Sequence, residues 1–299
     1  MAGNINYQHL YYFWNVIKEE SFTKASKKLG LAQPTVSGQI STFEKTVGAQ
    51  LISRQGKKIF LTETGRIVFN YADKIFSLGD KMNDDIKNSR YHHCNTLTIG
   101  HRNSMPGCIT ANVSNFIHNR FEDYRVSCIM DNNHSILNDL SRNFLDIVIT
   151  DEPFSYLNGV SLFSHLLFES EISLLCQSQY TDRFSNFHPD IIEKYPCILP
   201  THNTRMRRLL DDWIMGQQIK SLVIAEVESF DVMINMAKSS CLLMFAPTII
   251  LKDIREQIDF LEIYRITKPR IKYYMTTLAK NPEKDIINNI IKNTQFIFS

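Results

Sequence analysis

The chain has 299 residues, 43% hydrophobic and 21% charged, so it is too long for one typical domain and too apolar for a disordered chain. No apolar run approaches the ~20 residues needed to cross a bilayer, and no basic cluster precedes an apolar segment at the start, so we expect a cytoplasmic protein. Residues 1–90 hold 13 Lys and Arg against 8 Asp and Glu, and the other 209 residues hold 20 against 23. A basic segment joined to a slightly acidic body suits a nucleic-acid-binding module with a second function.

Three short helices are expected in the first 47 residues. Apolar residues recur at steps of three and four over residues 7–19, which is the period of one helical face. Ser21 is a natural N-cap for a second helix over residues 22–29, and Gly30 supplies the positive φ of a tight turn. Pro34 fits the first turn of a third helix, because proline there loses no needed N–H. This order predicts a helix-turn-helix.

The outer face of the third helix is polar, small and uncharged. Ser, Thr, Gln and Gly are poor helix formers, and a solvated helix normally carries Glu and Lys there instead. Such a face suits the major groove of DNA, where Gln pairs bidentately with adenine and Ser or Thr reaches bases and phosphates; an ordinary polar surface is the alternative. The candidate DNA-contacting residues are Thr23, Gln33, Pro34, Thr35, Ser37, Gly38, Gln39, Ser41 and Thr42.

Residues 51–64 predict two short strands around a basic turn. Arg54, Lys57 and Lys58 at this turn would neutralise phosphates beside the minor groove, which makes residues 1–65 a winged helix-turn-helix. A long linker helix, capped by Thr62 or Thr64, is expected over residues 64–90. Its apolar stripe approximates a heptad seam, which predicts pairing with a second copy of the chain. The seam residues are Val68, Tyr71, Ile75, Leu78, Met82 and Ile86.

From residue 95 onward, short strands alternate with helices, which predicts an α/β fold with parallel strands covered by helices. We expect strands near residues 97–99, 126–130, 146–150, 172–177, 197–199, 222–226, 242–245 and 271–279. Helices are expected near residues 106–121, 135–142, 205–215, 229–238, 248–257 and 283–295. Two lobes joined by two crossings follow, lobe I with residues 95–165 and 268–299 and lobe II with residues 166–267.

Residues 10–65 resemble the DNA-binding domain of LysR-type transcriptional regulators. The matching positions are Phe13, Val16, Ser21-Phe22-Thr23, Ala25, Leu29, Gln33-Pro34, Val36-Ser37, Gln39-Ile40, Glu44, Gly48, Leu51, Arg54, Leu61-Thr62 and Gly65. The remaining chain has the family's layout of a linker helix and an effector domain like a periplasmic solute-binding protein. Ser26, Phe43 and Ile52 replace the family's usual Ala, Leu and Phe, and Gly38 stands where many members place a base-contacting arginine.

Further positions resemble the subgroup that activates sodium/proton antiporter genes. They are residues 6–14 and 71–73, with Pro200-Thr201, Arg207-Arg208, Trp213 and Pro247-Thr248, and this subgroup also tends to carry a small residue at the place of Gly38. The resemblance implies a homodimer or homotetramer that binds an inverted repeat in double-stranded promoter DNA and acts through RNA polymerase. It also implies a small effector, either an ion or an unidentified organic molecule, bound between the lobes.

The effector residues implied by the resemblance lie at the ends of strands. They are Gly100, His101, Arg102, Asn103, Ser104, Asp131, Asn132, Thr150, Asp151, Thr201, His202, Asn203, Thr204 and Glu228. Hydroxyls and helix-start N–H groups suit an anion, whereas Asp131, Asp151 and Glu228 suit a cation, although each acid could equally cap a helix or pair with a base. His101 or His202 would suit a proton signal.

Two other classes of function are disfavoured. An enzyme is not expected, because the chain has no G-x-G-x-x-G, G-x-x-x-x-G-K-[ST], G-x-S-x-G or H-E-x-x-H motif. A solute receptor explains residues 95–299 but not the winged helix-turn-helix. No cofactor, disulfide or metal site is expected either, since the six cysteines are far apart and His92-His93-Cys94 has no fourth ligand type nearby.

Overall fold

The computed structural model describes residues 5–55, 58–89, 95–157, 159–183, 188–239, 241–257, 259–279 and 284–298. The chain divides into two units, residues 1–91 and residues 92–299. Within the described ranges, no helix is both long enough and apolar enough to cross a membrane. The His92-His93-Cys94 cluster lies outside the described residues.

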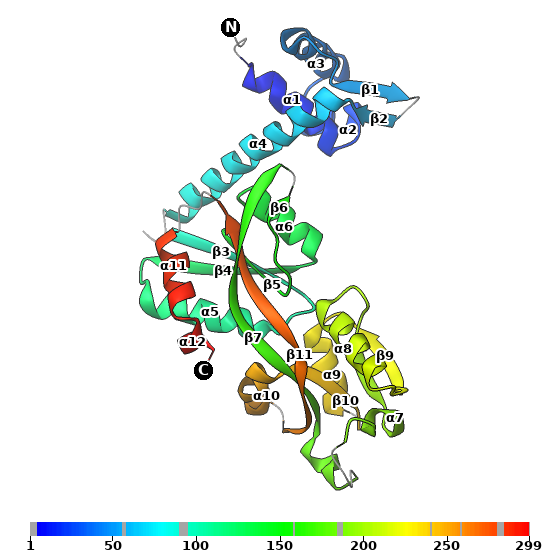
Figure 1. The fold of residues 1–299 in the computed structure, drawn as a ribbon. Coiled ribbons are helices and arrows are strands. Elements are labelled where there is room, and N and C mark those ends of the chain that lie inside the picture. The colour runs from blue at the N-terminus through cyan, green and yellow to red at the C-terminus, as the bar shows by residue number, and fades with distance from the viewer. Residues whose placement is uncertain are drawn as a thin grey trace. The chain divides into compact units, whose positions relative to one another are not determined.

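The first unit consists of three short helices, a two-stranded hairpin and one long helix (Figure 1). These elements are α1 (Tyr7–Lys18), α2 (Phe22–Leu29), α3 (Gln33–Val47), β1 (Ile52–Gln55), β2 (Lys58–Leu61) and α4 (Glu63–Ser89). The Ser21 hydroxyl accepts the N–H of Lys24 at the start of α2, and Gly30 ends this helix with φ of 65°. Both helix borders predicted from these two residues are confirmed.

A buried carboxylate joins α1 to α4. The Trp14 indole Nε1 donates to Asp73 Oδ1 at 2.9 Å, and Lys18 Nζ lies 3.8 Å from the same oxygen and 4.4 Å from the centre of the Trp14 ring. Asp73 is only 2% exposed, so these partners offset the cost of burying its charge. Phe13 and Phe43 pack beside this contact in the core of the unit.

The hairpin is attached to its neighbours by side-chain bonds to the backbone. Glu44 Oε1 accepts the N–H groups of Leu51 at 2.7 Å and Ile52 at 3.0 Å. Thr62 Oγ1 accepts the N–H of Gly65 at 2.9 Å, so Thr62 caps α4. A Cβ atom on Gly65 would lie 1.9 Å from the carbonyl oxygen of Leu51, so only glycine allows α4 to begin this close to β1.

Replacing Gly65 with Ala should therefore destabilise the first unit, because the methyl group meets backbone that cannot move aside. We expect the free energy of unfolding to fall by about 3 kcal/mol, measured by urea denaturation of the full chain. Gly38→Ala is the matched control, since nothing lies within 4 Å of its added Cβ, and it should raise stability by about 0.5–1 kcal/mol. Equal effects of the two substitutions would contradict the steric argument.

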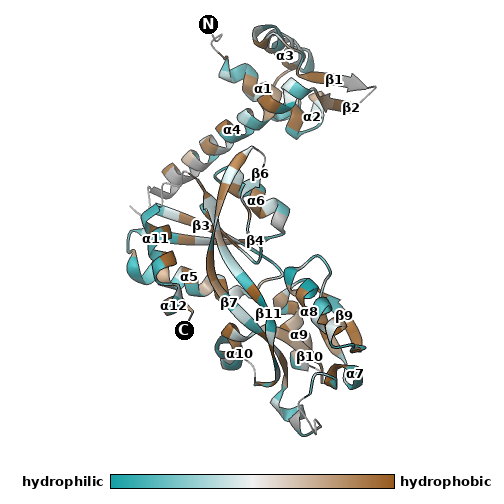
Figure 2. Cartoon of the chain, in the orientation of Figure 1, coloured by the Kyte–Doolittle hydropathy of each residue, from teal (hydrophilic) through white to brown (hydrophobic). Residues whose placement is uncertain are grey.

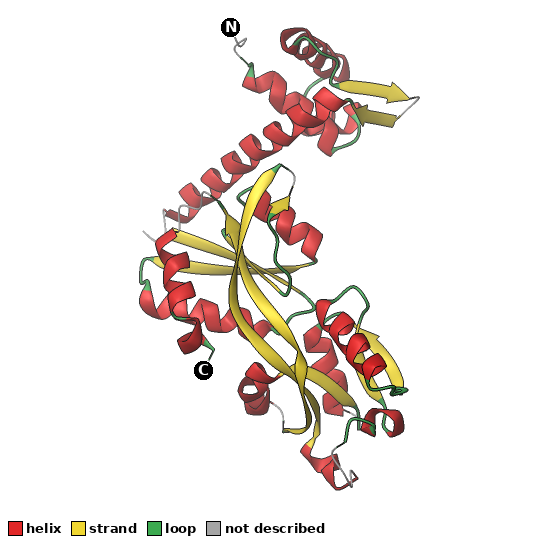
Figure 3. Cartoon of the chain, in the orientation of Figure 1, coloured by secondary structure: helices red, strands yellow, loops and turns green. Residues whose placement is uncertain are grey.

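The second unit is built on one continuous mixed sheet (Figure 3). Its strands are β3 (Asn95–Arg102), β4 (Tyr124–Asp131), β5 (Ile147–Thr150), β6 (Tyr156–Leu157), β7 (Val160–Gln177), β8 (Cys197–Pro200), β9 (Val223–Val227), β10 (Leu243–Pro247) and β11 (Phe260–Leu278). Their order is β4-β3-β5-β11-β7-β10-β8-β9, with β6 paired to β7. The three strands at each end run parallel to one another, as predicted, while β7 and β11 run antiparallel to their neighbours.

Helices cover the sheet and connect its strands. They are α5 (Gly107–Arg120), α6 (Asn133–Ser141), α7 (Ile191–Lys194), α8 (Arg205–Gly216), α9 (Phe230–Ser239), α10 (Leu251–Gln257), α11 (Lys284–Lys292) and α12 (Thr294–Ile297), with 3-10 turns at Ser178–Arg183 and Thr248–Ile250. The single helix predicted over residues 283–295 is thus two helices, separated at Asn293.

The strands β7 and β11 are far longer than predicted. They contain 18 and 19 residues, whereas the sequence indicated strands only at 172–177 and 271–279. Polar residues interrupt the apolar pattern of both, and Pro269 lies where the register shifts between Ile266 and Ile271. The two strands lie between the two sets of parallel strands, where the sequence predicted two crossings between lobes.

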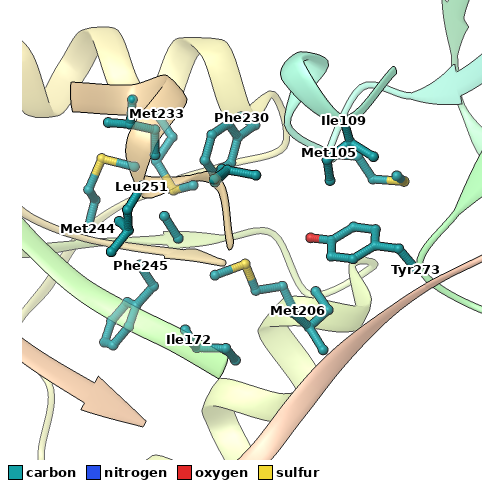
Figure 4. Packing of buried hydrophobic residues seen from close by; sticks show 14 of the residues in the cluster. Met105, Ile109, Ile172, Met206, Phe230, Met233, Met244, Phe245, Leu251 and Tyr273 are labelled. Atoms are coloured by element: carbon teal, nitrogen blue, oxygen red, sulfur yellow. The ribbon is translucent and has the colours of Figure 1, made fainter. Parts of the chain in front are cut away.

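One hydrophobic cluster extends across these strands from one predicted lobe into the other, while Ile136, Leu140 and Leu145 belong to a separate cluster. Met105, Ile109 and Tyr273, from lobe I, belong to the same buried cluster as Met206 and Phe230, from lobe II (Figure 4). The predicted lobes therefore share one buried apolar cluster, which includes residues of β7 and β11.

Candidate functional site

The outer face of α3 is open to solvent, as its sequence predicted. Val36, Ile40 and Phe43 are buried, whereas the polar residues of the opposite face are exposed or half-buried. The exposed members are Gln33, Pro34, Thr35, Gly38, Ser41 and Thr42, and the half-buried ones are Ser37 and Gln39. This surface is the candidate DNA-reading face.

The start of α3 has no side-chain cap. Ala32 stands at the N-cap position, where it has no oxygen to accept the first N–H groups of the helix. Uncapped N–H groups and the positive end of the helix dipole attract an anion such as a phosphate. Thr23 of α2 reaches this helix start, because its Oγ1 donates to Gln33 Oε1 at 3.0 Å.

The middle of α3 carries a glycine that its own unit does not require. No atom lies within 4 Å of a Cβ built on Gly38, and glycine inside a helix costs about 0.5–1 kcal/mol relative to alanine. Thr42 Oγ1 donates back to the Gly38 carbonyl at 3.1 Å. Gly38 lowers the stability of α3 without serving the packing of its own unit. A glycine at such an exposed position is expected where the helix backbone must come close to a binding partner.

The predicted wing is present as a hairpin. β1 and β2 pair antiparallel, with Arg54 opposite Ile59 and Gln55 opposite Lys58. Lys57 lies outside the described residues, as do the side chains of Arg54 and Lys58. Contact of these three cations with phosphates stays a prediction.

Helix α4 exposes a long apolar stripe, visible as recurring hydrophobic bands in Figure 2. The exposed side chains are Ile67, Tyr71, Ile75, Leu78, Met82 and Ile86, spaced by four, four, three, four and four residues. Val68, predicted to belong to the stripe, instead packs against the core of the first unit. The phase of the helix is set by Ala72, which is buried there, so Ile67 takes the place of Val68 in the proposed seam.

In the second unit, a buried ion pair stands at the border between the lobes. Arg102 Nη1 donates to Asp151 Oδ1 at 2.8 Å, and both side chains are less than a tenth exposed. Arg102 Nη2 also donates to the carbonyl oxygen of Asn203, in the other lobe, at 3.3 Å. Two further contacts cross this border, from the N–H of Phe230 to the carbonyl oxygen of Asn103 at 3.2 Å and between Arg208 and Glu152.

The predicted effector residues are only partly brought together. Thr201 Oγ1 donates to Asn203 Oδ1 at 2.6 Å, and Asn203 Nδ2 donates to Glu228 Oε1 at 3.4 Å, so these three form one chain of bonds beside Arg102. Thr204 caps α8 instead. Gly100 has a packing role, because a Cβ on it would lie 2.5 Å from Leu145 Cδ1.

The acids proposed for a cation already have partners. Asp131 and Asn132 form the start of α6, where hydrogen bonds from Ser135 and from the backbone of Asn132 hold the pKa of Asp131 below its usual value. Thr150 Oγ1 donates to the Glu152 carbonyl oxygen. Among the residues that the structure describes, no three or more His, Cys, Asp or Glu side chains are grouped as a metal site would need.

The two predicted histidines lie in different surroundings. His101 is buried, with Nδ1 2.8 Å from Thr110 Oγ1, and neither its Nε2 nor the nearby Ser104 hydroxyl has a hydrogen-bond partner in the described part of the chain. Burial lowers the pKa of His101, an effect that the charge of Asp231 opposes.

His202 is exposed and lies in a charged network on lobe II. Its Nε2 is 3.0 Å from Arg207 Nη2 and 3.4 Å from Glu226 Oε1, and its Nδ1 is 3.6 Å from Asp211 Oδ2. The buried Arg207 also donates to Asp211 at 2.7 Å and to Glu226 at 2.8 Å, and it holds the pKa of Glu226 below its usual value. Sequence reasoning missed Asp211 and Glu226, because no local pattern in the sequence indicates that they lie beside His202 in the fold.

The comparisons with known proteins cover both units. Residues 7–66 match the family described as bacterial regulatory helix-turn-helix protein, lysR family, and residues 92–285 match the LysR substrate binding domain. The chain belongs to the LysR family. It is a DNA-binding transcription regulator with an effector-binding domain, and the sequence resemblance to this family is confirmed.

Individual LysR relatives differ in how much of the chain they match. The transcriptional activator protein NhaR of Escherichia coli K12 is 27% identical over 272 residues, which are 91% of this chain and 89% of NhaR. The HTH-type transcriptional regulator BenM of Acinetobacter baylyi is 43% identical over 75 residues, a quarter of either chain. The fold resembles full-length CbnR complexed with its target DNA, with a TM-score of 0.64 at 15% identity over 98% of this chain and 99% of that one.

The Arg102–Asp151 pair gives a stability prediction. Asp151→Ala should leave the Arg102 charge buried without its carboxylate, which we expect to cost about 3–5 kcal/mol in the free energy of unfolding of the second unit. Glu228→Ala is the control, since its carboxylate is exposed and its loss should cost about 1 kcal/mol or less. Urea denaturation of both variants measures the difference, and a loss below 1 kcal/mol for Asp151→Ala would mean that solvent reaches Arg102.

Proposed function

We propose that this LysR regulator binds an inverted repeat in promoter DNA as a dimer or tetramer and activates transcription through RNA polymerase. The observation that carries the activator role is the similarity to the transcriptional activator NhaR over 91% of the chain. The polar face of α3, open along its length, supplies the DNA-reading surface, and the exposed stripe of α4 supplies the seam between two copies.

The genes controlled are those of sodium/proton antiporters or of the response to cation stress. This assignment is supported by the similarity to NhaR and by the subgroup residues noted in the sequence. One of these, Asp73, forms the buried contact with Trp14, and another, Arg207, forms the network around His202. Two of the subgroup positions therefore have structural roles, one in each unit.

A proton acting at His202 is the effector that the geometry supports best. Burial lowers the pKa of His101 and so disfavours its protonated form, and the acids proposed for a cation are already bonded within the chain. Neutral His202 accepts from Arg207 through Nε2, whereas a protonated ring can only donate and must turn from Arg207 toward Glu226 or Asp211. The adjacent Asn203 carries this change to Arg102 across the lobe border.

DNA footprinting on the gene's own upstream region tests this function. The protein should protect two half-sites, and the footprint should change between pH 6 and pH 8 at fixed ionic strength. His202→Gln should remove the pH dependence without removing protection. Sodium compared with potassium at equal ionic strength separates specific sensing from screening, because screening acts equally on both ions. A footprint that is identical in all four conditions would leave an organic effector as the better account.

The seam gives a separate prediction. Ile75→Glu would bury a charge on both copies of the stripe without a partner, at a cost of several kcal/mol to assembly. Sedimentation should show a smaller species for this variant. Asn83→Glu is the control, because Asn83 is exposed on α4 away from the stripe, and it should assemble normally. Normal assembly of Ile75→Glu would show that the seam lies elsewhere.

A further inference from the structure

One side-chain bond connects the two helices of the helix-turn-helix at the start of α3. Thr23 stands in the first turn of α2 and Gln33 is the first residue of α3, and the Thr23 hydroxyl donates to Gln33 Oε1 at 3.0 Å. Both side chains are exposed, next to the candidate DNA-reading face of α3. The bond holds the amide oxygen of Gln33 toward α2, so the amide NH2, on the other side of the same carbon, is directed away from it.

We infer that Thr23 is a positioning residue that makes Gln33 a hydrogen-bond donor toward DNA, so that the base it reads is guanine rather than adenine. Adenine presents one acceptor, N7, and one donor, the N6 amino group, so bidentate pairing needs both the oxygen and the NH2 of the glutamine. Guanine presents two acceptors, N7 and O6. The amide oxygen could accept a second bond, but Thr23 holds it on the side of α2, so the group that Gln33 turns away from α2 is the NH2 donor, which matches guanine and repels the adenine amino group.

The surroundings of the pair support this orientation. Ala32 provides no cap, so the first N–H groups of α3 remain available to a phosphate, and such a contact would set the depth at which Gln33 meets the base edge. A neutral hydrogen bond on a wet surface favours one orientation by only about two- to tenfold. Exclusion of water in the groove strengthens it. This inference rests on the proposed DNA-reading role of α3.

Selection of binding sites from a randomised duplex library by the full-length protein tests it. The position read by Gln33 is the one whose preference disappears in Gln33→Ala. At that position the wild-type protein should select guanine. Thr23→Val keeps the shape of the side chain but removes the hydroxyl, and it should lower the guanine-to-adenine ratio by about tenfold. Thr23→Ser restores the hydroxyl and should keep the wild-type ratio, while affinity for unselected duplex stays equal in all three proteins.

A base analogue checks the contact itself. Replacing the selected guanine with 7-deazaguanine removes N7 and should weaken binding by wild type and Thr23→Ser at least about fivefold, but not by Gln33→Ala. Selection of adenine by wild type, equal ratios for Thr23→Val and Thr23→Ser, or no change at any position in Gln33→Ala would each overturn the inference. If wild type enriches no sequence at all, the DNA-reading role of α3 fails as well, which separates the two outcomes.

Discussion

The antiparallel pairing of β7 with β11 is the constraint on which the second unit depends. Each lobe is a set of parallel strands attached to one side of this pair, β5 to β11 and β10 to β7. Any rotation of one lobe against the other must therefore twist two long strands whose hydrogen bonds run through both lobes. The contacts of Arg102 and Asn103 with lobe II also join the two sets of strands, so the same rotation would have to lengthen or break them.

In the first unit, helix α4 has two apolar sides, one packed on the core and one exposed. The inner side of α4 is fixed by Ala72 and by the bond between Asp73 and Trp14, and its start is fixed by the close approach of Gly65 to β1. Because the rotation of α4 about its own axis and its starting point are both fixed, its exposed apolar stripe can face only one way. The same contacts hold α1 under α3, so the seam and the reading face are placed by a single small core.

Local signals in the sequence predicted the helices well, because caps act within a few residues. Ser21, Gly30 and Thr62 each mark a border through a bond to their own neighbourhood. The long strands were missed because their polar residues read as loops, and only pairing with each other stabilises them. The effector residues were the hardest to judge. Asp151 is neutralised by a residue 49 positions away and His202 is grouped with Glu226 from another strand, and no local pattern reports such partners.

The far half of α4 has a consequence for how the regulator assembles. Beyond Ser77 no described side chain of this helix is buried, and a solitary helical segment of that length is marginal in water. In the proposed assembly a second copy would cover this stripe, so the stability of the far half of α4 would depend on the protein's concentration. On the proposed inverted repeat, two copies would be held at high local concentration, which would favour this pairing.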